Sequence, residues 1–104
     1  MDQDLTYRVE RAALGAMITS AQMAARLGYL EPADFTDRRN RWMYRAVRVL
    51  GDYSPLAGEE RRDRIARVAG GHRMGRSFVD ELVAACPDAS HGPAYGAMLV
   101  QATT

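Results

Sequence analysis

The clearest helical pattern in the chain is RRNRWMYRAVRVL, residues 38–50. Its apolar side chains recur at positions i, i+1, i+4, i+5 and i+8 and so share one face of a helix; they are Trp42, Met43, Ala46, Val47 and Leu50. Four basic side chains fall on the opposite side, namely Arg38, Arg41, Arg45 and Arg48. Asp37 directly precedes the pattern and is a favoured N-cap residue. The sequence therefore predicts a strongly two-faced helix that ends near Leu50.

The segments before this helix show weaker patterns of the same kind. An apolar stripe over residues 5–17 predicts a first helix. Ser20 is an expected N-cap for a second helix, and Gly28 is expected to end that helix in a left-handed conformation. Residues 32–35 are expected to form a single turn that places Phe35 in the core.

Three more helices are expected in the second half of the chain. Residues 59–69 predict a charged helix with a thin apolar seam. Ser77 is expected to cap a helix that Pro87 ends. The last helix should begin near Ser90, with Pro93 in its first turn, where a missing N–H costs nothing. Its expected buried stripe is Ala94, Tyr95, Met98, Leu99 and Ala102.

These patterns predict an all-α fold. No segment shows sustained alternation of apolar and polar residues or the β-branched enrichment of a strand. The 104 residues correspond to one small domain, and 47% hydrophobic with 26% charged residues is an ordinary globular composition. We therefore expect one domain, residues 1–104, folded as a compact bundle of five to six short helices.

The composition excludes several kinds of chemistry. All 14 basic residues are arginine, so a P-loop lysine and a lysine Schiff base are absent. Cys86 is the single cysteine, so it has no disulfide partner within the chain. The net charge of +1 provides no global field that would attract nucleic acid or anionic lipid. The acidic start and the lack of a long apolar run predict a cytoplasmic protein with no membrane partner.

No group of residues predicts a catalytic, cofactor-binding or metal site. His72, His91 and Cys86 do not have the spacing of zinc ligands. Cys86 falls on the apolar stripe of its helix, which favours a buried structural thiol over a nucleophile. The carboxylate pairs 59–60 and 80–81 lie at the beginnings of predicted helices, where the helix dipole explains them. We therefore expect no enzymatic activity and no cofactor.

Two arginine groups are the strongest surface features. The first is the stripe on residues 38–48, whose default interpretation is a solvated face. The same stripe could contact a phosphate backbone or an acidic protein, which makes its members the candidate partner-binding residues: Arg38, Arg41, Arg45 and Arg48. The second group alternates with acidic side chains and predicts an exposed, salt-bridged helix; it comprises Arg61, Arg62, Arg64 and Arg67.

A series of motifs, in the same order as in the family, resembles the N-terminal domain of the bacterial hexameric replicative DNA helicase of the DnaB type. Residues 10–18, ERAALGAMI, resemble that family's E-x-x-x-L-G-x-x-[IL], and residues 30–35, LEPADF, resemble its L-x-P-x-D-F turn. Residues 40–47, NRWMYRAV, resemble its H-R-x-[IL]-[YF]-x-A helix, with Asn40 in place of histidine. Residues 78–82, FVDEL, resemble its Y-L-x-x-L motif, and residues 86–89, CPDA, resemble its T-P-x-A motif.

The resemblance implies a helical head domain without the helical hairpin and ATPase motor that follow it in the family, because the chain stops at Thr104. Residues 51–74 also depart from the family pattern. In the family, the head domains form a collar and help to dock primase and loader proteins. We therefore expect a non-catalytic protein–protein interaction module of DNA replication assemblies, with helicase, primase or a loader as partner, or with self-association. The alternative is a small nucleic-acid-binding module that uses the arginine face of the helix over 38–48.

Overall fold

The computed structural model describes residues 2–50, 56–70 and 75–103, and its regular secondary structure there is entirely helical. The α helices of this part of the chain are α1 (Gln3–Thr19), α2 (Ala21–Arg26), α3 (Arg38–Leu50), α4 (Gly58–Ala69), α5 (Arg76–Ala84) and α6 (Gly92–Thr103). Two short 3-10 turns join them, η1 (Pro32–Asp34) and η3 (Ala89–His91). The prediction of an all-α bundle of five to six short helices is confirmed.

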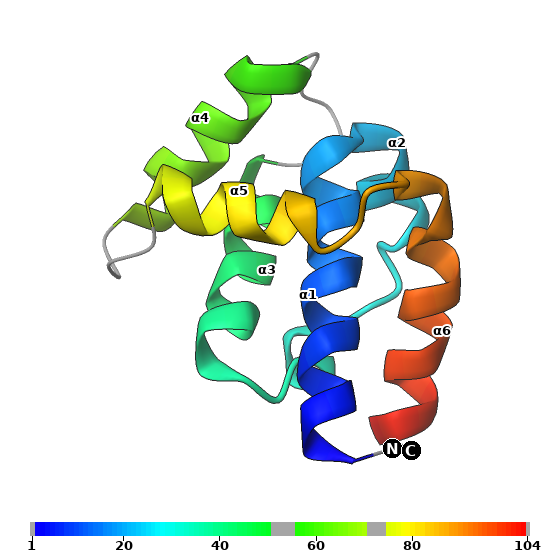
Figure 1. The fold of residues 1–104 in the computed structure, drawn as a ribbon. Helices are drawn as coiled ribbons and strands as arrows, with labels where there is room; N and C mark the ends of the chain where they lie inside the picture. Colours follow the sequence, from blue (N-terminus) through cyan, green and yellow to red (C-terminus); the bar gives the residue numbers. More distant parts are fainter. Residues whose placement is uncertain (1, 51–55, 71–74, 104) are drawn as a thin grey trace.

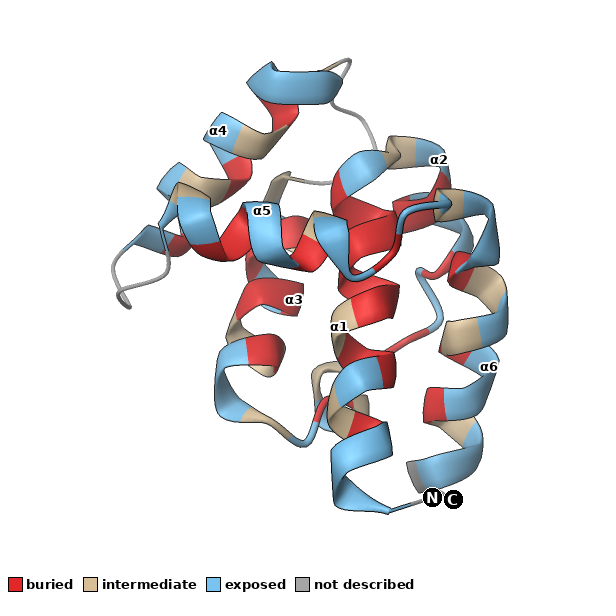
Figure 2. Ribbon diagram, in the orientation of Figure 1, coloured by how far each residue is buried: buried red, intermediate tan, exposed pale blue. Residues whose placement is uncertain are grey.

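Helix α1 is the centre of the bundle and contacts all five other α helices (Figure 1). Helix α6 runs beside it in the opposite direction, so that the first turn of α1 and the last turn of α6 lie next to each other. Helix α5 crosses α1, and α4 packs against α3 and α5. Every residue from Ala12 to Ile18 is buried, so the middle of α1 is enclosed on all sides and not on one stripe only (Figure 2).

The predicted helix starts are mostly confirmed because side-chain caps form where they were expected. The Ser20 hydroxyl accepts a hydrogen bond from the Met23 N–H at 3.2 Å, and the Asp37 carboxylate accepts one from the Asn40 N–H at 3.0 Å. The prediction for Ser77 is wrong: α5 begins at Arg76 with Gly75 as its N-cap, so Ser77 lies inside the helix. Pro93 lies in the first turn of α6, as predicted.

The prediction of a left-handed Gly28 is also wrong. Among the glycines that the structure describes, positive φ occurs at Gly58. Helix α2 instead ends at Arg26, and the N–H of its C-cap residue Leu27 bonds back to the carbonyls of Met23 and Ala25. After it, Leu30 and Phe35 are both buried, and the Phe35 ring stacks on Tyr44 of α3 at 4.7 Å between centroids. The predicted inward turn at residues 32–35 is therefore confirmed.

Glycines set the closest helix contacts in the bundle. A Cβ at Gly15 would collide with the carbonyl oxygen of Leu82, so α5 crosses α1 at the one position without a side chain. In α6, a Cβ at Gly92 would lie 2.8 Å from the Ala16 Cβ, and one at Gly96 would lie 2.6 Å from the Tyr29 hydroxyl. The inner face of α6 is therefore built on glycine.

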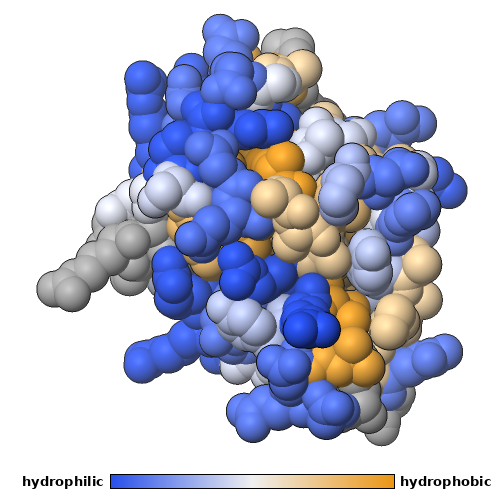
Figure 3. Space-filling view, viewed as in Figure 1, coloured by the Kyte–Doolittle hydropathy of each residue, from blue (hydrophilic) through white to orange (hydrophobic). Residues whose placement is uncertain are grey.

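For this reason the predicted stripe of α6 is only partly correct. Leu99 is buried and Tyr95 is partly buried, whereas Ala94, Met98 and Ala102 are exposed. Because glycine permits the closest approach, α6 turns its Gly92 and Gly96 side inward and leaves alanine and methionine outside. Leu5, predicted to belong to the buried stripe of the first helix, is also exposed and lines the same shallow surface as Met98. Figure 3 shows apolar surface between α1 and α6 on this side.

Across residues 2–50, 56–70 and 75–103, no helix combines the length and the apolar character that a bilayer crossing requires.

Candidate interaction face on helix α3

The arginine face, which consists of Arg38, Arg41, Arg45 and Arg48, is divided between two structural and two exposed side chains. Arg41 donates from Nε to the Phe35 carbonyl at 3.0 Å and from Nη2 to the Thr36 carbonyl at 3.5 Å. It therefore holds the turn that precedes α3. Because its polar atoms contact the backbone, Arg41 contributes positive charge to the face but has fewer donors left for a partner.

Arg48 connects three helices. Its Nη2 donates to the Ala24 carbonyl of α2 at 2.8 Å, and its Nε donates to the Tyr44 hydroxyl at 3.0 Å. The guanidinium also lies over the Tyr44 ring, 5.1 Å from the centroid, and contacts the Met17 sulfur of α1 at 3.8 Å. Tyr44 in turn donates to the Leu30 carbonyl. Arg48 therefore stabilises the packing of these three helices, and part of its side chain remains exposed.

Arg38 and Arg45 are the outward-facing members of the arginine face. Both are exposed, and neither forms an ion pair or hydrogen bond with the part of the chain that the structure describes. They are seven residues apart, which corresponds to two helical turns and roughly 10 Å along the axis. Helix α3 contains five arginines and no carboxylate, so nothing on the helix itself neutralises these two groups.

A shallow hollow of about 500 Å³ lies beside the C-terminal half of the arginine face. Its lining residues come from α3 and from the segment that leads into η1; they are Gly28, Leu30, Glu31, Pro32, Tyr44, Arg45, Arg48 and Val49. Val49 is 73% exposed, the most exposed of the large apolar side chains that the structure describes. Glu31, which lines the same hollow as Arg45, is also exposed.

The position of α3 depends on a buried carboxylate that composition and spacing did not identify. Glu10 of α1 is fully buried, and its Oε2 accepts hydrogen bonds from the Thr36 N–H at 2.8 Å and hydroxyl at 2.7 Å. Its Oε1 accepts from the Asp37 N–H at 3.2 Å and from the Asn40 side-chain amide at 3.1 Å. A negative charge thus lies at the positive end of α3, where arginines stand in the first turn. In the sequence, Glu10 could be recognised only as an acidic residue beside the apolar stripe of the first helix.

Arg61 corrects the prediction that the second arginine group forms an exposed helix. It is fully buried, and it donates from Nε to the Ile18 carbonyl and from Nη2 to the Met17 carbonyl, both at 2.8 Å. These carbonyls belong to the last turn of α1, which has no intrahelical partners for them and carries the negative end of the helix dipole. Position 61 also shares a helix face with buried Ile65 and Ala69, a spacing that would have indicated its burial.

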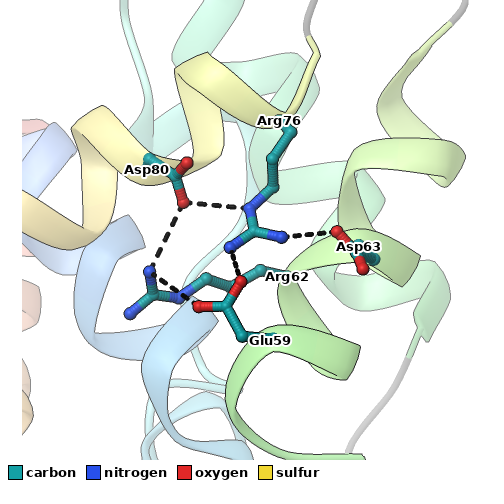
Figure 4. Close-up of polar contacts among 5 residues, drawn as sticks. All are labelled: Glu59, Arg62, Asp63, Arg76 and Asp80. Carbon is teal, nitrogen blue, oxygen red and sulfur yellow. Dashed lines mark hydrogen bonds and ion pairs between the residues drawn. The ribbon is translucent and has the colours of Figure 1, made fainter.

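The remaining arginines of α4 agree better with the prediction. Arg64 and Arg67 are exposed, and Arg62 joins an ion-pair cluster between α4 and α5 (Figure 4). At its centre, Arg76 of α5 pairs with Asp80 at 2.9 Å and with two carboxylates of α4, Glu59 and Asp63. The hydrogen bond from Arg76 holds the pKa of Asp80 below its ordinary value. The cluster is exposed and internally paired, so it joins α4 to α5.

The groups most suited to catalysis or metal binding are Cys86 and the two histidines. Cys86 is buried, its thiol donates to the Asp88 carbonyl at 3.2 Å, and burial raises its pKa, which disfavours the reactive thiolate. His91 is exposed beside Asp88, and His72 lies outside the described residues. Within the described ranges, His, Cys, Asp and Glu side chains do not gather in groups of three or more that could hold a metal ion.

Comparisons of the chain with known protein families, with curated proteins and with solved structures give no match.

Proposed function

We propose that this protein is a non-catalytic interaction module that docks in DNA replication assemblies, with the arginine face of α3 as its contact surface. Its partners are the replicative helicase, primase or a loader protein. The proposal assigns the chain no reaction and no cofactor. It combines the sequence resemblance to the helicase head domain with the geometry around α3.

The observation that carries the proposal is that the charged groups fall into two sets, one buried and bonded inside the fold and one facing outward. Glu10 and Arg61 are fully buried; Glu10 bonds to α3 and to the segment before it, and Arg61 bonds to backbone carbonyls of α1. In contrast, Arg38, Arg45 and the apolar Val49 are exposed on α3, and Arg45 and Val49 also line the hollow. Arginine and apolar side chains next to each other are typical of protein interfaces, whereas a catalytic site needs convergent titratable groups.

The residues behind the resemblance have structural roles that support a head-like fold. Glu10 and Asn40, from two different motifs, are hydrogen-bonded to each other. Gly15 permits the crossing of α1 and α5, and Phe35 stacks on Tyr44. Asn40, which replaces the family's histidine, keeps a side-chain donor directed at the Glu10 carboxylate. The motifs therefore meet in the core although they are far apart in the sequence.

Binding to purified, nucleic-acid-free helicase and primase from the organism that encodes the chain tests the proposal. We expect co-elution on size exclusion and a calorimetric signal with at least one of them. The double variant Arg38→Glu, Arg45→Glu should lose most of that affinity, because it reverses the two unpaired charges. Arg64→Glu, an exposed arginine on α4, is the matched control and should bind normally. Failure of the wild-type chain to bind helicase, primase and, in the same assay, the purified loader would contradict the proposal.

The alternative, a nucleic-acid-binding module, is favoured by the five arginines and missing carboxylates of α3. Because Arg41 and Arg48 contact the backbone, phosphate contacts would come mainly from Arg38 and Arg45. Two phosphate contacts give a slope of log K against log salt of only about −2, whereas four give about −4. Fluorescence anisotropy with duplex DNA measures this slope. Submicromolar affinity with a slope of about −2 or steeper, lost in the Arg38→Glu, Arg45→Glu variant, would favour the alternative over protein docking.

A further inference from the structure

The hollow beside α3 has the chemistry of a site for a protein side chain. Leu30, Pro32 and Val49 contribute apolar groups to its lining, and Arg45 lies at its margin. The volume of about 500 Å³ falls within the usual range of binding pockets, about 300 to 1,000 Å³. An exposed valine beside an exposed arginine supplies both the apolar and the charged contact of an interface.

We propose that this hollow docks an acidic helical segment of a protein partner. The segment places an apolar side chain among Leu30, Pro32 and Val49, and its carboxylates pair with Arg45 and Arg38. This inference rests on the proposed function and specifies the chemistry of the partner.

Charge complementarity favours an acidic occupant. Helix α3 carries five positive charges and no negative one, and its Arg45 guanidinium can form two parallel hydrogen bonds with a carboxylate. A basic segment would be repelled by the whole arginine face. Carboxylates seven residues apart on a partner helix are two turns apart, which matches the separation of Arg38 and Arg45.

The same surroundings disfavour a phosphate backbone in the hollow. Glu31 lines the hollow, is exposed and would repel phosphates, whereas a protein segment can place an uncharged or basic side chain next to it. Asp34 and Asp37, the other carboxylates of this segment, accept hydrogen bonds from the Glu31 and Asn40 backbone N–H groups. An apolar hollow also offers nothing to a sugar-phosphate chain, because such a chain has no large apolar side chain.

Synthetic peptides test the inference on the full chain. The first peptide is an amphipathic helix with a leucine face and glutamates two turns apart beside it, and the second is the same peptide with the glutamates replaced by arginine. Labelled peptide gives the affinity by fluorescence anisotropy, and nitrogen–proton correlation spectra of the labelled chain locate the contact. We expect the acidic peptide to bind at least about tenfold more tightly than the basic one and to shift the amide signals of Leu30, Arg45 and Val49.

Three variants of exposed residues sharpen the test. Arg45→Glu and Val49→Asp should each weaken binding of the acidic peptide about tenfold, and Arg64→Glu on α4 should not change it. Arg45→Glu should also reduce the preference for the acidic peptide over the basic one. Equal binding of both peptides, or shifts confined to another face, would overturn the inference. So would helicase or primase binding that is insensitive to Arg45→Glu and Val49→Asp; docking in a replication assembly would then stand, but through a surface other than the arginine face.

Discussion

The Arg61 Nε of α4 donates a hydrogen bond of 2.8 Å to the carbonyl oxygen of Ile18, at the C-terminal end of α1. A fully buried arginine thus joins a peripheral helix to the central one. The last carbonyls of a helix have no intrahelical donor and attract positive charge, so the contact satisfies both partners. This bond explains why α4, whose apolar seam is thin, packs against the bundle.

Replacing Arg61 should therefore destabilise the whole fold. Arg61→Ala leaves a cavity and removes the donors to two buried carbonyls, and we expect the free energy of unfolding to fall by about 3 kcal/mol. Arg64→Ala, on the exposed side of the same helix, should change it by less than about 0.5 kcal/mol. Urea unfolding followed by circular dichroism measures both. Equal, small effects would show that Arg61 is not the connection between the two helices.

Glu10 should be sensitive to a nearly isosteric change. Glu10→Gln keeps the volume, but an NH2 group replaces one carboxylate oxygen and directs its donors at the N–H group that donates to that oxygen in the wild type. We expect a loss of about 3 kcal/mol, because buried hydrogen bonds to a charged group are lost and unsatisfied donors remain. Glu60→Gln, an exposed position on α4, is the control and should be neutral. A stable Glu10→Gln variant would contradict the assigned role of the carboxylate.

Gly15 should tolerate no side chain. In Gly15→Ala the new Cβ meets the backbone carbonyl of Leu82, which cannot move without shifting α5. We expect a loss of about 3 kcal/mol or more, or failure to fold. Gly70→Ala is the matched control, because Gly70 has a helical φ of −61° and open space around it. That variant should be as stable as the wild type or slightly more stable. Thermal unfolding distinguishes the two, and equal melting temperatures would disprove the close crossing.

The ion-pair cluster predicts a specific titration. Hydrogen bonding to Arg76 lowers the pKa of Asp80, so its contribution to stability is present above the unfolded value of about 3.9 and is lost as the pH falls through the folded value. In Arg76→Gln the pKa of Asp80 should rise toward its ordinary value. Asp88, whose pKa is lowered by hydrogen bonds from Ser90, should be unaffected. Carbon-detected NMR titration of both carboxyl groups checks this, and an unchanged Asp80 would contradict the geometry.

The sequence predicted most of the fold because apolar period and helix caps are local properties. The patterns around α3 and the caps at Ser20 and Asp37 needed no tertiary information. The inner face of α6 was not predicted, because the prediction counted regularly spaced apolar side chains and glycine has no side chain. Gly92 and Gly96 face inward because a neighbouring residue lies close, and that neighbour is far away in the sequence.

The candidate site was predicted only in part, for a related reason. The arginine face was visible as a stripe, but its arginines have two different roles. Arg41 and Arg48 bond to backbone carbonyls of other segments, whereas Arg38 and Arg45 face outward. Which arginine does which depends on carbonyls supplied by other parts of the fold, and helical spacing alone does not contain that information. The hollow beside Val49 likewise forms only when α3 meets the segment before η1.

The most direct test of the central claim is a titration of the isotope-labelled chain with purified primase and with purified helicase, observed by nitrogen–proton correlation spectra. Docking through the arginine face predicts that at least one of these proteins perturbs the signals of Arg45 and Val49 at a lower concentration than it perturbs those of α6. Docking through this face also predicts that the Arg45→Glu variant no longer shows these signal changes and that the Arg64→Glu variant still does. Unchanged spectra with both proteins, together with perturbation of the same signals by duplex DNA, would contradict it.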